Sequence, residues 1–93
     1  MSLRRAHLRI HGLVQGVSFR ACARDEALRL KIFGWIRNLD NGEVEALAEG
    51  APDDVDQFVR WCNDGPPQAE VESVTLQDDE NATGEFISFE VVR

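Results

Sequence analysis

The amino-acid sequence predicts a single α+β domain over residues 1–93, with two helices on one face of an antiparallel or mixed sheet. Segments that alternate between apolar and polar residues are typical of half-buried strands, and two segments with helical spacing separate them. The order along the chain is β, α, β, β, α, β and a short final strand, which is a split βαβ arrangement. A chain of 93 residues is long enough for one core between a sheet and a helical layer.

Two apolar patterns define the first strand and the first helix. Residues 6–11 alternate and end at Gly12, which predicts a strand whose buried side is formed by Ala6, Leu8 and Ile10. Apolar residues then recur at helical intervals, which predicts a helix from about Arg20 or Ala21 to Lys31. Its buried stripe consists of Phe19, Ala23, Ala27 and Leu30, with Cys22 on the flank.

A hairpin is predicted after this helix. Residues 33–38 and 43–49 both alternate, and the Asn41-Gly42 pair between them is the strongest short-range hairpin signal. In the second of these strands the residues expected to be buried are Val44, Ala46 and Ala48. Those expected to point outward are Glu43, Glu45 and Glu49.

The remaining elements are a second helix and two strands. Pro52 suits the first helical position, and the acidic residues after it complement the positive end of the helix. The apolar face of this helix consists of Val55, Phe58, Val59 and Cys62. Residues 64–67 end it. The segments that follow are predicted as a strand (69–76), an exposed acidic loop (77–85) and a final strand (86–92).

Composition and charge narrow the function classes. The net charge is −7, but residues 1–37 hold eight of the ten Lys and Arg residues and two of the seventeen Asp and Glu residues. An anionic ligand is therefore expected to bind to this half. No apolar run reaches the length of a membrane span, and the start lacks a secretory signal, so a cytoplasmic protein is expected. Cys22 and Cys62 have neither disulfide nor zinc spacing and are expected to be small core residues.

The segment GLVQGVSFR, residues 12–20, is the best candidate for a binding site. A glycine-bearing loop between a strand and a helix directs several backbone N–H groups toward one spot beside the positive helix end. The candidate donors are the amides of Gln15, Gly16, Val17, Ser18 and Phe19. Arg20 adds a planar fork that matches phosphate oxygens. The alternative is a tight connection whose arginine pairs with a surface carboxylate.

Four motifs together indicate a protein family more specifically than this loop does alone. They are GLVQGVSFR (12–20), GWIRN (34–38), GEVE (42–45) and GPPQAEV (65–71). With these motifs the chain closely resembles the acylphosphatase family over essentially its whole length. The resemblance implies a ferredoxin-like α/β sandwich and the hydrolysis of small acyl phosphates to a carboxylate and inorganic phosphate, without a metal or cofactor.

The resemblance also implies roles for individual residues. In the family, the loop amides and the arginine bind the phosphoryl group, which carries over to residues 15–20 and to Arg20 as a catalytic residue. The asparagine that ends the GWIRN strand orients the attacking water, and this role carries over to Asn38. From the residues alone, without the other motifs, a turn-forming asparagine is the favoured interpretation of Asn38.

Other polar residues receive simpler interpretations. His7 and His11 are expected to be solvated, with no third metal ligand beside them. Ser18 has no evident base, which argues against nucleophilic catalysis. Arg24, one helical turn after Arg20, could strengthen the local positive field, but pairing with Asp25 or Glu26 is the favoured expectation. The family often has glycine at the position of Lys31, so the end of the first helix is expected to be less stable here.

Two alternative functions share the fold. The first is a non-catalytic anion-binding or RNA-binding module, but the glutamates on the predicted strands and the lack of aromatic RNA-binding motifs disfavour it. The second is an accessory domain related to carbamoyl-phosphate-using maturation proteins. Because no zinc-finger cysteines or transferase region follow, a free-standing monomeric hydrolase without nucleic-acid or membrane partners is expected.

Overall fold

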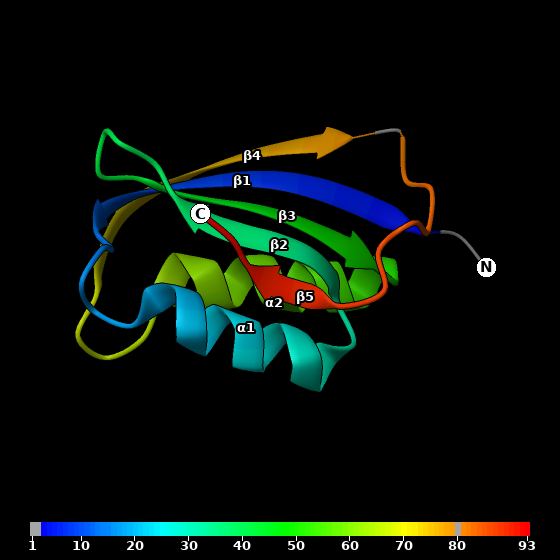
Figure 1. The fold of residues 1–93 in the computed structure, drawn as a ribbon, viewed down its shortest axis with the longest axis horizontal. Helices are drawn as coiled ribbons and strands as arrows, with labels where there is room; N and C mark the ends of the chain where they lie inside the picture. The colour runs from blue at the N-terminus through cyan, green and yellow to red at the C-terminus, as the bar shows by residue number, and fades with distance from the viewer. Residues whose placement is uncertain (1–2, 80) are drawn as a thin grey trace.

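The computed structural model describes residues 3–79 and 81–93. Its elements in chain order are β1 (Arg4–Leu13), α1 (Phe19–Leu30), β2 (Phe33–Asn38), β3 (Val44–Gly50), α2 (Pro52–Asp64), β4 (Glu70–Asp79) and β5 (Phe89–Val91). The strands form one sheet in the order β4-β1-β3-β2-β5, in which β2 and β5 are parallel and the other neighbours are antiparallel. Figure 1 shows both helices packed against one face of this sheet. The predicted fold class is confirmed.

The core lies between the sheet and the two helices. The predicted inward residues of β1 and β3 are buried, and so is the predicted stripe of α1. On α2, Val55, Phe58 and Cys62 are buried, whereas Val59 is partly buried at the edge of the core. Burial raises the pKa of the Cys62 thiol, which fits a core residue. Cys22 is only partly buried.

Glu49, which was expected to point outward into solvent, is buried. It lies on the outward side of β3, yet it is 2% exposed, because Arg5 and residues 83–86 cover it. Arg5 donates a hydrogen bond from Nε to Glu49 Oε2 at 2.9 Å, and the backbone N–H of Gly84 donates to Glu49 Oε1 at 2.8 Å. Phe86 packs against the guanidinium, 5.1 Å from its ring centre. A buried charge needs such partners, since without them its desolvation is unfavourable.

The last strand is shorter than predicted. Residues 86–92 were expected to pair, but β5 comprises Phe89–Val91 only, because the chain before it covers the Arg5–Glu49 pair and Ile87 is 92% exposed. β4 in turn extends to Asp79, beyond its predicted end. The predicted acidic loop therefore starts later, and its residue 80 lies outside the described residues.

The hairpin between β2 and β3 is confirmed, with a longer turn than two residues. Residues 39–43 form it, with the Leu39 N–H donating to the Glu43 carbonyl at 2.8 Å and the Gly42 N–H donating to the Leu39 carbonyl at 3.2 Å. Gly42 has φ +93°, a conformation that favours glycine. The Asn41 side chain accepts a hydrogen bond from the Glu43 N–H, which closes the turn locally.

The end of α1 supports a stability prediction. Lys31 has φ +59° and ψ +42°, and the N–H groups of Ile32 and Lys31 bond to the Ala27 and Leu28 carbonyls in a Schellman motif. A side chain in this conformation costs about 1 kcal/mol relative to glycine. Lys31→Gly is therefore expected to raise the free energy of unfolding by about that amount.

Urea denaturation would measure this change. Lys31→Ala is the matched control, because it removes the charge and keeps the Cβ atom, and we expect no comparable gain. A loss of stability in Lys31→Gly would show that the lysine side chain, rather than the backbone conformation, dominates at this helix end.

Candidate active site

The sheet places the loop after β1 next to the end of β2. Val44 of β3 pairs with Ile10 of β1 on one side and with Asn38 of β2 on the other. β1 and β2 therefore run in the same direction and end at the same edge of the sheet. Figure 1 shows the loop that enters α1 and the turn between β2 and β3 at this end of the molecule. Asn38 is thus brought close to the loop predicted to bind an anion.

The backbone of this loop has a left-handed conformation at two residues and open space beside Gly16. Gly16 has φ +76° and Ser18 has φ +62°, and no atom lies within 4 Å of a Cβ built on Gly16. Among the residues that the structure describes, none accepts a hydrogen bond from the amides of residues 15–20. The first turn of α1 contains no acidic residue that would compete at the positive helix end. The loop therefore presents unpaired donors beside a helix N-terminus.

A pocket of about 460 Å³ opens beside this loop. Its lining residues come from the loop, α1, β2 and β5, and they are Val14, Gly16, Ser18, Phe19, Arg20, Ala21, Arg24, Asn38 and Val91. None of these described lining residues has a carboxylate, imidazole or thiol. The pocket therefore combines two guanidinium groups, backbone amides and one carboxamide, which favours an anionic ligand.

Arg20 is available to such a ligand. It is partly exposed, and among residues 3–79 and 81–93 no carboxylate forms an ion pair with it. The alternative in which this arginine pairs with a surface carboxylate is therefore not observed. Its guanidinium can bind two oxygens of a phosphoryl group in a planar fork.

Asn38 has an unusual environment. Its Oδ1 is buried, and within the described part of the chain it accepts no hydrogen bond. A buried polar atom without a partner typically costs about 1–3 kcal/mol, and such atoms require an explanation. A carboxamide oxygen next to an anion-binding pocket can accept a hydrogen bond from a water molecule. A turn-forming role alone does not account for this buried, unpartnered oxygen.

Arg24 also lines the pocket, although pairing with a neighbouring carboxylate was the favoured expectation for it. Its Nη2 lies 3.8 Å from Asp25 Oδ1, so the expected pairing with Asp25 is observed at long range. The other candidate partner, Glu26, accepts a hydrogen bond from Arg29 Nε at 2.7 Å instead. Because Arg24 follows Arg20 by one helical turn, the two share a helix face, and this spacing was the available signal.

Two of the predicted loop residues do not line the pocket. Val17 packs against the core, and the side chain of Gln15 reaches the turn between β2 and β3. The other predicted residues that line it are Gly16, Ser18, Phe19, Arg20 and Asn38. The predictions for Gln15 and Val17 concern their backbone amides.

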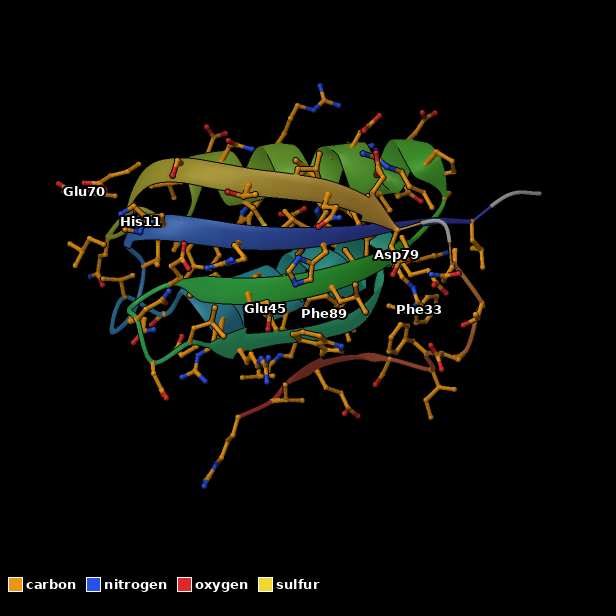
Figure 2. The ribbon with its side chains drawn as sticks, turned by 90° about the horizontal axis from the view of Figure 1, so that it is seen from above. His11, Phe33, Glu45, Glu70, Asp79 and Phe89 are labelled. Atoms are coloured by element: carbon orange, nitrogen blue, oxygen red, sulfur yellow. The ribbon has the colours of Figure 1, made fainter. Side chains whose placement is uncertain are left out.

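The histidines lie away from this pocket, on the open face of the sheet. Figure 2 shows His11 near one end of β1 and Glu45 on β3, on the side opposite the helices. His7 Nε2 lies 2.7 Å from Glu45 Oε2, and His11 Nε2 lies 3.3 Å from Glu72 Oε2, so both pair with carboxylates rather than being simply solvated. Burial raises the pKa of Glu45, but hydrogen bonds from His7 and Arg37 outweigh it and hold this pKa below its usual value.

Within residues 3–79 and 81–93, neither helix is long and apolar enough to span a membrane.

Comparisons with known proteins identify the family of this chain. The profile of the acylphosphatase family matches residues 6–91. An acylphosphatase of Pelotomaculum thermopropionicum is 48% identical over 91 residues, which cover 98% of each chain. An acylphosphatase of Chloroflexus aurantiacus is 48% identical over 92 residues, which cover 99% of each chain.

Solved structures extend the comparison to the fold. The crystal structure of acylphosphatase from Bacillus subtilis has a TM-score of 0.92 at 32% identity, covering 99% of this chain and 100% of that one. With nearly half of the residues shared with full-length relatives and the same arrangement of strands and helices, the chain belongs to the acylphosphatase family.

Proposed function

We propose that the amides of residues 15–20 and the guanidinium of Arg20 hold the phosphoryl group of an acyl phosphate while Asn38 orients the attacking water. The substrates of the family are small acyl phosphates, and the products are a carboxylate and inorganic phosphate. The unpaired, buried Oδ1 of Asn38 beside a pocket with two arginines is the observation that carries this proposal.

The chemistry requires few catalytic groups. Water attacks phosphorus, a new P–O bond forms, and the bond between phosphorus and the acyl oxygen breaks with its electron pair on the departing carboxylate. The conjugate acid of that carboxylate has a pKa of about 4, so the leaving group needs no proton from the protein. The proton of the water passes to the phosphate product or to solvent. The described pocket residues provide no general acid, which agrees with this route.

Positive charge in the pocket stabilises the transition state. Phosphoryl transfer depends mainly on positioning and on stabilising charge on the equatorial oxygens. Arg20 and the loop amides provide donors for these oxygens, and Arg24 adds a second guanidinium one turn away. These groups can supply the charge stabilisation that a bound cation provides in other phosphoryl-transfer enzymes.

We therefore expect hydrolysis of acetyl phosphate to be independent of metal ions. The measurement is the release of inorganic phosphate by the protein, before and after dialysis against a chelator. The rate should remain within about twofold, because arginine charge does not depend on a bound ion. A loss of activity on dialysis that Mg²⁺ restores would contradict this mechanism.

The domain organisation, oligomeric state, location and partners of the protein are also proposals. We infer that residues 1–93 act as one catalytic domain, as a cytoplasmic monomer without nucleic-acid partners. The absence of nucleic-acid partners is supported by the open sheet face, where Glu43 and Glu45 pair with the basic side chains that a phosphate backbone would otherwise bind. A gel shift with single-stranded RNA at low salt tests the RNA-binding alternative. The same fold forms 12% of full-length HypF, at 21% identity and a TM-score of 0.85, a likeness of fold alone.

A further inference from the structure

The side chain of Gln15 connects the loop to the turn that follows Asn38. Its Nε2 donates hydrogen bonds to the Leu39 carbonyl at 2.8 Å and to the Glu43 carbonyl at 2.9 Å. Both acceptors lie in the turn between β2 and β3, and Leu39 is the residue after Asn38. Among the described residues, these are the only hydrogen bonds between residues 14–18 and residues 39–43.

The chemistry of this contact is specific to glutamine. Each carbonyl already accepts one backbone hydrogen bond within the turn, from the Gly42 N–H or the Leu39 N–H, so each has one lone pair left. The NH₂ group of Gln15 offers two hydrogens, one for each carbonyl. A flipped amide would place its oxygen against two carbonyl oxygens, so the network assigns the orientation. Glutamate has no donor, and asparagine is shorter by one methylene group.

The contact between Gln15 and the turn helps to fix the position of the Asn38 carboxamide. Asn38 is the last residue of β2, and its Oδ1 accepts no hydrogen bond from the described residues. Its place relative to the loop therefore depends on the backbone that carries it. Gln15 holds that backbone against the same loop whose amides and arginine face the pocket.

We propose that Gln15 is a positioning residue that sets the separation between the Asn38 carboxamide and the loop amides. This inference rests on the proposed role of Asn38. By fixing that separation, Gln15 aims the attacking water at the bound phosphoryl group. A displacement of about 1 Å in such a geometry typically lowers the rate about a hundredfold.

The test is Gln15→Met, which preserves the length of the side chain and the backbone amide and removes both donors. Gln57→Met, an exposed position on α2, is the matched control. We expect kcat on acetyl phosphate to fall about tenfold to a hundredfold in Gln15→Met, and the inhibition constant of inorganic phosphate to change by less than about threefold. The control should retain its kcat. If Gln15→Met does not fold, Gln15→Asn gives the same comparison.

A double-mutant cycle separates positioning from a general structural effect. In an Asn38→Ala background, Gln15→Met should change kcat by less than about twofold, because the group that it positions is already absent. An equal loss of kcat in both backgrounds would overturn the proposal. Phosphate inhibition that weakens by the same factor as kcat would overturn it as well, because Gln15 would then support anion binding. If Asn38→Ala alone remains fully active, the proposed role of Asn38 fails, which is a separate result.

Discussion

Arg20→Lys is expected to lower kcat/KM for acetyl phosphate about a hundredfold to a thousandfold, the loss typical of removing one well-placed donor from an electrostatic site. Lysine retains the positive charge but presents a point charge on a flexible stem, so the bidentate contact with two phosphoryl oxygens is lost. The inhibition constant of inorganic phosphate should rise as well, because this contact is made in the bound ground state as well as in the transition state.

The fold should tolerate this change. Arg20 is partly exposed and forms no ion pair with the described residues, so its replacement should alter the free energy of unfolding by less than about 0.5 kcal/mol. Arg60→Lys, an exposed arginine on α2, is the matched control and should keep full activity. Steady-state kinetics together with thermal unfolding would measure both effects. Activity of Arg20→Lys within twofold of the parent would refute the proposed phosphate site.

Asn38→Ala is expected to have the second large effect, a fall in kcat of about a hundredfold or more. The alanine side chain cannot accept a hydrogen bond, so the water is no longer oriented toward phosphorus. Phosphate inhibition should change by less than about threefold, because Arg20 and the loop amides remain. This pattern differs from that of Arg20→Lys, in which binding and turnover are lost together.

Stability provides a second readout for Asn38. Because its Oδ1 is buried without a partner, removing it should leave the free energy of unfolding unchanged or raise it by up to about 1 kcal/mol. Asn63→Ala on α2 is the control, since that side chain donates to the Val59 carbonyl on an exposed helix face and does not line the pocket. A strongly destabilised Asn38→Ala with a normal kcat would assign the residue to the turn alone.

Most of the architecture could be predicted from local patterns. The buried stripe of α1 and the inward side of β3 follow from periodicity, because residues on one face of an element share one environment. Pro52 at the start of α2 and the turn at Gly42 follow from backbone preferences that act within a few residues. The ends of β4 and β5 were predicted less well, because the end of a strand depends on the neighbouring strand with which it pairs and not on local sequence alone.

Some residues of the candidate site could likewise be predicted from local motifs, and others could not. Arg20, Asn38 and the loop of residues 15–20 were named from motifs, since each motif is contiguous in the chain. The part played by Arg24 depends on which helix face borders the pocket, and that of Gln15 depends on carbonyls 24 and 28 residues away. The spacing of Arg20 and Arg24 is visible in a short segment, but the pocket that their helix face borders and the contact of Gln15 are not.

The sequence by itself determined the order of the elements, the buried faces and the chemical types of the pocket residues, because these are local properties of the chain. Only the tertiary structure decided that Asn38 ends beside the loop of residues 15–20, that Gln15 bonds to the turn carrying it, and that Glu49 is buried by Arg5. The physical reason is that these arrangements arise from strand pairing and loop closure between distant residues, whose register depends on the packing of the whole sheet.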